Sequence, residues 1–279
     1  MKHILITGVS SGIGYDAVRY FVNKGYHVFG SVRKDVDVKH LTQDFPHNFT
    51  CLQFDVTDVA QIDRAKAIVE QALAGESLCA LVNNSGFAQS GPMALLSDQA
   101  FRLQIEVNVF GVRNVVNAFL PLLGASTTFK GKAGRIINIS SISGVLNTPM
   151  NGAYCVAKHA LESLGEVYRR ELMMYGIQVS SIQPGPIQSK LWHKNANSMD
   201  EYLHSDYQHY ARNADRIMRA AQKNALPAEV ISKLIHHIIN SKRPRLSYIV
   251  TKNKWMNTLV ARYLPSRFVD YILYRALAR

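Results

Sequence analysis

Cysteine is scarce in this chain, and its placement excludes two classes of protein. Among 279 residues there are three cysteines, Cys51, Cys79 and Cys155, which lie far apart in the sequence. Such a set supplies neither the disulfide framework of a small secreted domain nor the paired ligands of a zinc site. The ten histidines form no HExxH pattern either. We therefore expect no bound metal and a reducing compartment, the cytoplasm.

Long hydrophobic runs are also missing. No stretch approaches the ~18 apolar residues that a membrane-spanning helix needs, and the apolar run after Lys2 is too short for the core of a signal peptide. Hydrophobic residues nevertheless make up 47% of the sequence, which suffices for a sizeable core. The composition predicts a soluble globular protein.

Acidic residues are fewer than basic ones, and the difference is concentrated near the C-terminus. The chain has 20 acidic and 32 basic residues and a formal net charge of +12. From residue 242 onward there are nine basic residues against a single acid, Asp270. The rest of the chain is only mildly basic, so binding of the whole protein to nucleic acid is not favoured.

Short apolar runs alternate with helical patterns along the first 250 residues. The runs are 3–7, 27–32, 49–54, 78–83, 134–140, 177–183 and 246–250; helical patterns cover 13–24, 59–73, 98–123, 152–175 and 228–240. Near-continuous apolar strands separated by helices are typical of a parallel sheet covered on both faces. The chain is therefore predicted to be an α/β protein. Its Rossmann-type doubly wound sheet of about seven strands would bind ligands at the carboxyl ends of the strands.

The alternation stops after the sixth run. Residues 1–250 are expected to form one dinucleotide-binding catalytic domain, within which the polar and aromatic stretch 189–226 is expected to be a helical lid over the substrate. The alternative is a helical pair on the surface. The side chains expected to line the lid are Leu191, Trp192, Met199, Tyr202, Tyr207, Tyr210 and Met218. An apolar lining favours a hydrophobic carbonyl compound or secondary alcohol as substrate.

A glycine-rich loop follows the first predicted strand and opens the first helix. It reads Thr7-Gly8-Val9-Ser10-Ser11-Gly12-Ile13-Gly14. Glycines permit a tight turn and the close approach of backbone to a pyrophosphate, which then rests on the positive end of the helix. The spacing differs from the common G-x-G-x-x-G fingerprint. The inference therefore depends on the position of the loop, and a simple turn is the alternative.

The end of the second predicted strand bears on the choice of cofactor. A carboxylate there would bind the ribose 2′-hydroxyl of NAD, whereas a basic residue accommodates the 2′-phosphate of NADP. The strand ends at Val32, Arg33 and Lys34, and the first acid is Asp35. Arg33 can form a fork onto a phosphate, with Ser11 as an added hydroxyl. NADP(H) is favoured over NAD(H); the alternative is that Arg33 is merely solvated and the enzyme uses either cofactor.

Ser141, Tyr154 and Lys158 are candidates for proton transfer to a substrate oxygen. Tyr154 and Lys158 share a helix face at i and i+4, and Ser141 follows the fifth predicted strand. The Tyr-x-x-x-Lys spacing alone is not specific, since Tyr20 with Lys24 and Tyr248 with Lys252 repeat it. We expect Ser141 to bind the substrate oxygen and Tyr154 to exchange its proton. The charge of Lys158, with an oxidised nicotinamide, should lower the pKa of that tyrosine.

These motifs, from Thr7 to about Val250, resemble the short-chain dehydrogenase/reductase family in its compact single-domain branch. The resemblance also rests on Asp55, on Asn83-Asn84-Ser85-Gly86, on Asn108 and on Pro184-Gly185. It implies a seven-stranded sheet, a proton relay through a water held by Asn108, and a set of cofactor-binding residues. That set is Thr7, Gly8, Ser10, Ser11, Gly12, Ile13, Gly14, Arg33, Asp55, Val56, Asn83, Ser85, Gly86, Tyr154, Lys158, Pro184, Gly185, Ile187 and Ser189. Two departures are Ser85, where the family has alanine, and Ser189, where it has threonine.

The resemblance predicts an oxidoreductase that transfers a hydride between NADP(H) and a carbonyl or secondary alcohol. A non-catalytic cofactor sensor or scaffold is the alternative, although such proteins usually lose the tyrosine or lysine. A sugar epimerase of the longer branch normally has different glycine spacing. The segment 184–192 is similar to the branch acting on steroids, retinoids and other lipid-like alcohols. A homo-oligomer is expected, because the helices at 98–123 and 152–175 resemble the pair used for dimer contacts; alternatively both only cover the sheet.

Residues 251–279 form a basic extension with a helical apolar pattern. The apolar positions are Phe268, Val269, Ile272, Leu273, Ala276 and Leu277, and Lys252, Lys254, Arg262, Arg267, Arg275 and Arg279 lie around them. Two interpretations remain open. In the first, the helix packs on the catalytic domain or a partner subunit and partly closes the substrate site. In the second, it makes peripheral contact with an anionic membrane.

Overall fold

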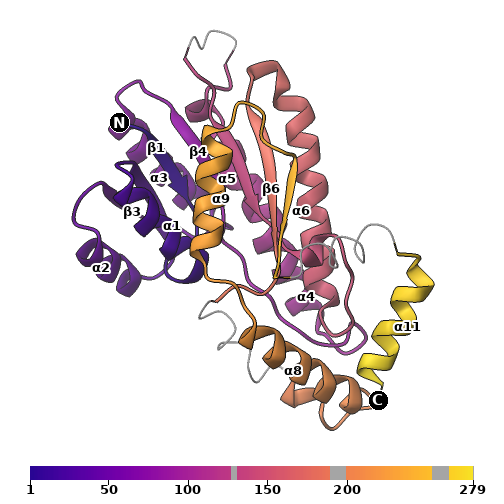
Figure 1. Ribbon diagram of the computed structural model, residues 1–279. Helices are drawn as coiled ribbons and strands as arrows, with labels where there is room; N and C mark the ends of the chain where they lie inside the picture. Colours follow the sequence, from indigo (N-terminus) through magenta and orange to yellow (C-terminus); the bar gives the residue numbers. More distant parts are fainter. Residues whose placement is uncertain (127–130, 189–198, 253–263, 279) are drawn as a thin grey trace.

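The core of the protein is a seven-stranded sheet in which every neighbouring pair of strands is parallel (Figure 1). The computed structural model describes residues 1–126, 131–188, 199–252 and 264–278. The strands are β1 (His3–Ile6), β2 (His27–Val32), β3 (Phe49–Gln53), β4 (Leu78–Asn83), β5 (Arg135–Ile139), β6 (Gln178–Pro184) and β7 (Ser247–Val250). Their order, β3-β2-β1-β4-β5-β6-β7, reverses direction between β1 and β4, where ligands bind in such sheets.

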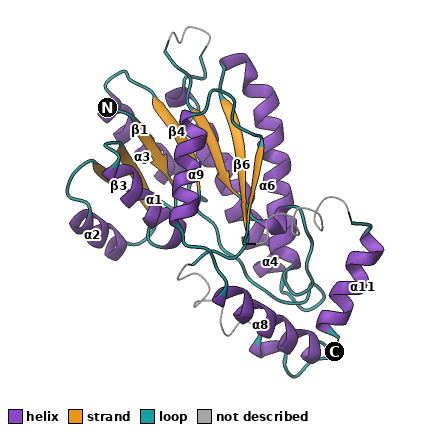
Figure 2. Ribbon diagram, in the orientation of Figure 1, coloured by secondary structure: helices purple, strands orange, loops and turns teal. Residues whose placement is uncertain are grey.

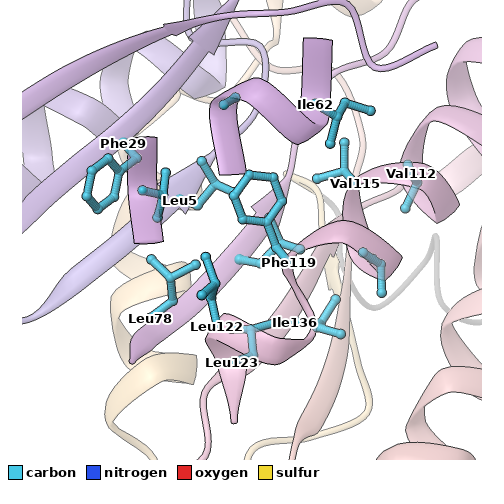
Figure 3. Packing of buried hydrophobic residues seen from close by; sticks show 14 of the residues in the cluster. Leu5, Phe29, Ile62, Leu78, Val112, Val115, Phe119, Leu122, Leu123 and Ile136 are labelled. Atoms are coloured by element: carbon cyan, nitrogen blue, oxygen red, sulfur yellow. The ribbon is translucent and has the colours of Figure 1, made fainter. Parts of the chain in front are cut away.

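Alternate side chains of each strand enter two separate apolar clusters. Leu5 packs on one face of the sheet with Phe29, Phe119 and Ile136 (Figure 3). Ile4 and Ile6 point to the opposite face, into a cluster that includes side chains of helices α1 (Gly12–Asn23) and α9 (Glu229–Asn240). This period of two explains the continuous apolar runs, because both faces of the sheet are covered. The predicted doubly wound α/β fold is confirmed.

Helices cover both faces of the sheet (Figure 2). They are α1 (Gly12–Asn23), α2 (Asp35–Asp44), α3 (Val59–Leu73), α4 (Asp98–Ile105), α5 (Gly111–Phe119), α6 (Gly152–Glu171), α8 (Gln208–Lys223), α9 (Glu229–Asn240) and α11 (Ser266–Leu277). The sequence did not predict α2, whose one fully buried side chain is Leu41. A helix with so narrow an apolar stripe leaves little periodic signal.

The prediction of a single helix over residues 98–123 is wrong in detail, because the structure has four shorter helical elements there. After α4 the chain forms a π-helical turn, Glu106–Phe110, before α5 begins, and a short 3-10 helix, Pro121–Leu123, follows α5. Proline lacks a backbone N–H and cannot continue an α-helix in its interior, which accounts for the change at Pro121. The π turn contains Asn108, one of the predicted catalytic residues, and Asn108 is buried.

The lid and the C-terminal helix pack on each other beyond the carboxyl ends of the strands. Figure 1 shows α8 and α11 together at that end of the sheet. A third apolar cluster joins Met150, which precedes α6, to Met199 and Tyr202 of the lid and to Leu277 of α11. The Asn213 amide of α8 also donates to the Leu277 carbonyl over 2.9 Å. The inner face of α11 therefore packs on the protein. Within the described residues, no helix is both long and apolar enough to cross a membrane.

Candidate active site

The glycine-rich loop joins β1 to α1 at the point where the strand order reverses. A Cβ at Gly14 would collide with the backbone carbonyl of Gly8, so the loop closes on itself only with glycine at this position. Ser11, the N-cap of α1, makes no side-chain capping bond. The N–H groups of the first turn are thus left to water or to an anion. Thr7, Ser10, Gly12 and Ile13 lie on this same segment.

Asn84, which the sequence analysis did not select as a site residue, clamps this loop to the end of β4. Its amide nitrogen donates to the carbonyls of Thr7 and Gly8, each over 2.9 Å. The Thr7 hydroxyl accepts from the backbone N–H of Asn84 and of Ser85, also at 2.9 Å. Ser31 of β2 adds a bond, since its hydroxyl accepts from the N–H of Gly8. Buried polar groups are therefore paired across three strands, which fixes the shape of the loop.

Arg33 and Asp55 meet at the carboxyl ends of β2 and β3. Arg33 Nη1 lies 3.6 Å from Asp55 Oδ2, and the Arg33 side chain is largely exposed. Two bonds from Thr57 orient the other carboxylate oxygen of Asp55. An exposed ion pair contributes at most about 1 kcal/mol, so Arg33 can leave Asp55 for a stronger anion. By contrast, Val32 is buried in the apolar cluster at the same end of β2.

Asn108 is held by the π-helical turn against the loop that follows β4. It is fully buried; its amide donates to the carbonyls of Phe87 and Gln104, each over 3.0 Å. Its Oδ1 accepts from the N–H of Phe87 over 3.2 Å. A Cβ at Gly86 would lie 2.6 Å from Asn108 Oδ1 and 3.8 Å from Lys158 Nζ. The turn thus brings Asn108 and Lys158 to the same short piece of backbone, as π turns at functional sites often do.

Ser141 and Tyr154 come together from the end of β5 and the start of α6. Burial raises the pKa of Tyr154 to about 12, and a hydrogen bond with the Ser141 hydroxyl lowers it in part. The charge argument from sequence predicted a lowered pKa. The structure differs because desolvation of the phenol outweighs the hydrogen bond with Ser141. Tyr154 is therefore a neutral phenol throughout the neutral pH range, the form that a proton donor requires.

Lys158 lies beneath Tyr154 on the same face of α6. Its Nζ is 5.6 Å from the centroid of the Tyr154 ring and donates to the carbonyl of Ile139 over 2.9 Å. Burial lowers the pKa of Lys158 to about 8, although the Glu162 carboxylate opposes this shift. Glu162 is itself oriented by the Ser181 hydroxyl at 2.6 Å and the Gln183 amide at 2.9 Å. Sequence reasoning missed Glu162, Ser181 and Gln183. Ser181 and Gln183 orient the Glu162 carboxylate, whose negative charge favours the protonated form of Lys158.

The remaining predicted residues are distributed around these groups. Asn83 is buried and donates to Asn138 Oδ1 over 2.8 Å, so its side chain joins β4 to β5. Val56 is buried in the cluster under α3 and α5. Gly185 follows β6, where Pro184 is the last residue, and Ile187 pairs with Leu226 in an isolated bridge. Ser189, Leu191 and Trp192 lie outside the described residues.

A hollow of about 400 Å³ opens between the segment before α6, the lid helix α8 and the C-terminal helix α11. It is lined by Asn147, Thr148, Pro149, Tyr210, Asp270, Leu273 and Tyr274. Met150 follows this segment with a backbone φ of 64°, and its side chain enters the lid cluster. A non-glycine residue in the left-handed region is uncommon and often marks a functional site. Of the tyrosines expected to line the lid, Tyr210 faces the hollow, while Tyr202 is buried in the cluster.

We compared the sequence with models of known protein families. The model described as short chain dehydrogenase matches residues 2–200. The chain belongs to the short-chain dehydrogenase family. The expected membership is thus confirmed, and the match includes the glycine-rich loop, Asn108, Ser141, Tyr154 and Lys158.

Individual dehydrogenase relatives extend over the whole chain. The NADPH-dependent 3-dehydrocapnine reductase of Ornithobacterium rhinotracheale is 37% identical over all of this chain and 98% of the relative. The uncharacterised oxidoreductase YbbO of Escherichia coli K12 is 34% identical, and the match covers 98% of this chain and 94% of the relative. A short-chain dehydrogenase of Streptomyces avermitilis has a TM-score of 0.77 at 24% identity, covering 100% and 98% of the two chains. That structure agrees with the fold described above.

A dehydrogenase of this family needs a dinucleotide, and the residues present fit one. Glycine at position 14 lets the loop close tightly against the Gly8 carbonyl, and the first turn of α1 beside it has N–H groups that no side chain caps. Arg33 is exposed at the end of β2 where a 2′-phosphate would lie. The fit therefore extends from the pyrophosphate seat to the adenosine end of the cofactor.

Proposed function

We propose that this protein is an NADPH-dependent reductase that converts a hydrophobic carbonyl compound into a secondary alcohol. The arrangement of Ser141, Tyr154 and Lys158 beside the glycine-rich loop carries the proposal, because it pairs a proton donor with a seat for a hydride carrier. Support for NADPH comes from Arg33, and from the relative that reduces 3-dehydrocapnine with this cofactor. The hollow beside Tyr210 and Tyr274 has none of Ser141, Tyr154 and Lys158 in its lining; its proposed role is the entrance through which an apolar substrate reaches them.

Each residue of the site has a separate role in the proposed reduction. Bound NADPH would supply the hydride. The Ser141 hydroxyl would bind the substrate oxygen, and Tyr154 would give its phenolic proton to that oxygen. The positive charge of Lys158 would stabilise the tyrosinate that results. Asn108 would hold a water near Gly86 that links Lys158 to solvent, the route by which a proton returns to Tyr154.

A screen of purified protein against ketones, aldehydes and alcohols with NADPH or NADP would test this proposal. We expect oxidation of NADPH with apolar ketones, whose reduction gives secondary alcohols. Binding of the cofactor without turnover of any compound would favour a cofactor sensor instead.

The rate of reduction is expected to fall as the pH rises through about 8. Lys158 has a pKa of about 8 and loses its charge there, whereas Tyr154, with a pKa of about 12, keeps its proton. Loss of the charge removes the group that stabilises tyrosinate, so proton donation becomes less favourable. The pH dependence of kcat under saturating NADPH measures this. A flat profile up to pH 10 would contradict the role given to Lys158.

Arg33→Ala is expected to weaken NADPH binding more than NADH binding. A charge-assisted hydrogen bond contributes about 1.5–3 kcal/mol, which corresponds to roughly a tenfold to hundredfold rise in Kd for NADPH alone. Titration calorimetry with both cofactors measures the difference. Arg33 is a cleaner position for this test than Val32, because Val32→Asp would bury a carboxylate in the apolar cluster. Equal affinity of the unmodified protein for NADH and NADPH would refute the NADPH preference.

A homo-oligomer through the outer faces of α4, the π turn and α6 also remains our proposal. Leu103, Phe110, Val156 and Val167 on these elements are large, apolar and 43–48% exposed. Exposed apolar side chains at neighbouring positions often mark contacts between subunits. Analytical ultracentrifugation would measure the state of assembly.

A further inference from the structure

The outer face of α11 exposes large hydrophobic side chains. Phe268, Tyr271 and Ile272 are 51%, 54% and 43% exposed, although they belong to one helix of twelve residues. On the other side of the same helix, Leu277 is buried in the lid cluster. The apolar pattern predicted for this helix is thus divided between an inner side that packs and an outer side that does not.

Basic side chains stand at both ends of the exposed face. Phe268, Tyr271 and Ile272 occupy positions i, i+3 and i+4, and Arg275 follows at i+7, so all four share one face. Arg275 donates to the Tyr271 hydroxyl over 2.9 Å, with its guanidinium 5.6 Å from the Tyr271 ring centroid. Arg267 precedes Phe268 at the start of the helix. The face is therefore an apolar strip between two arginines.

The neighbouring lid helix adds positive charge. α8 packs on α11 and exposes Arg212, Arg216, Arg219 and Lys223. Arg219 is paired with Asp215 over 2.7 Å, whereas no ion pair within the described residues involves the other three. Both helices lie beyond the carboxyl end of the sheet (Figure 1). Positive charge is thus also exposed on the helix that packs against α11.

We propose that the outer face of α11 docks this protein onto an anionic phospholipid surface. Apolar and aromatic side chains flanked by arginines fit the boundary between headgroups and acyl chains, and each nearby cation adds attraction to anionic lipid. Tyrosine suits this boundary because its ring is apolar and its hydroxyl polar. A second copy of the chain fits less well. A twelve-residue helix is about 18 Å long, and one side of it offers far less than the ~800 Å² per partner of a stable interface.

Docking would bring the hollow to the membrane surface. Leu273 and Tyr274 of α11 line the hollow, while Phe268 and Ile272 of the same helix form the docking strip. An apolar substrate dissolved in the bilayer could then enter without crossing bulk water. This last consequence rests on the proposed reductase activity, whereas the docking itself does not.

The test is cosedimentation of the full chain with vesicles, using two paired variants. The vesicles contain phosphatidylglycerol and phosphatidylcholine in equal parts, or phosphatidylcholine alone. We expect binding only to the first kind at low salt, with weaker binding at high salt. Phe268→Ser with Ile272→Ser should reduce the partition coefficient by about tenfold or more, through lost apolar burial. Arg267→Gln with Arg275→Gln should also reduce it by about tenfold, through lost attraction.

Helix α3 supplies a matched control. Val59 and Ile68 are 55% and 50% exposed on that helix, whose acidic and basic residues are equal in number. Val59→Ser with Ile68→Ser should leave vesicle binding unchanged. The melting temperature and the turnover of a soluble carbonyl compound should stay the same in all three variants.

Three results would overturn the docking proposal. The first is that the unmodified protein does not bind anionic vesicles at low salt. The second is that the α3 control loses as much vesicle binding as the α11 variants do. The third is that, without lipid, the variant with Phe268→Ser and Ile272→Ser has a lower sedimentation coefficient than the unmodified protein. The last would show that the strip joins copies of the chain. Vesicle binding by a protein without turnover would count against the proposed reaction and leave the docking intact.

Discussion

Tyr154→Phe is expected to lower turnover by ~10² to 10⁴, the usual loss when a general acid is removed. The change deletes the phenolic hydroxyl that would give its proton to the substrate, and it leaves the ring over Lys158 in place. Because the glycine-rich loop is not touched, the affinity for NADPH should stay near that of the unmodified protein. Steady-state kinetics and cofactor titration on the same preparation measure both quantities.

Two other tyrosines with the same spacing to a lysine are the controls for this experiment. Tyr20 packs its ring against Phe21 and His236, contacts that phenylalanine preserves. The Tyr248 hydroxyl accepts from the N–H of Arg245 over 2.7 Å at an exposed position, where water can replace it. Tyr20→Phe and Tyr248→Phe should both keep nearly full turnover. Full turnover by Tyr154→Phe would refute the assignment of the proton donor.

Lys158→Met is expected to abolish most activity and to stabilise the fold. Burial lowers the pKa of Lys158 from 10.5 to about 8, so the buried charge costs about 3 kcal/mol at neutral pH. Loss of the bond to the Ile139 carbonyl returns about 1 kcal/mol of that. The net gain of about 2 kcal/mol should raise Tm by about 4 °C. Turnover should fall by ~10² or more, because tyrosinate loses its supporting charge.

The pH dependence of that gain follows from the direction of the pKa shift. Between pH 8 and 10.5 the unfolded chain holds a proton on Lys158 that the folded protein has released. The stability of the unmodified protein relative to the variant therefore rises across this window. The advantage of Lys158→Met should be complete below pH 8 and should disappear by about pH 10.5. Thermal unfolding of both proteins over this range measures it, and a variant that is less stable at pH 7 would contradict the account.

The sheet could be predicted from the sequence because both of its faces are buried. Runs such as 27–32 and 78–83 contain hardly any polar residues, and the observed strands have the same bounds. The glycine-rich loop was predictable for a related reason, since Gly14 touches the backbone of Gly8 and no other residue fits. Signals of this kind arise from local sterics and burial, which a single sequence carries directly.

Features that depend on contacts between distant segments could not be predicted in this way. Asn84 clamps Thr7 and Gly8 from 77 and 76 positions away, and the motif that contains it does not show which backbone groups its amide will bond. Glu162 likewise has distant partners, since Ser181 and Gln183 lie on β6. For Tyr154, sequence gives the nearby charge but not the depth of burial, so the direction of its pKa shift was wrong. For α11, helical spacing did not reveal which apolar residues pack inward.

The π-helical turn at Glu106–Phe110 makes the aim of Asn108 sensitive to chain length. A π turn is an α-helix with one residue too many, and each residue of a regular helix rotates the chain by ~100°. Removal of Val107 alone would let α4 run into α5 as one unbroken helix, a locally better backbone. The side chains before the cut would turn by that angle relative to those after it, and Asn108 would lose either Gln104 or Phe87. The position of Asn108 thus depends on the one extra residue of the π turn. A deletion that restores a regular α-helix would move Asn108 away from the backbone at Gly86 that it shares with Lys158.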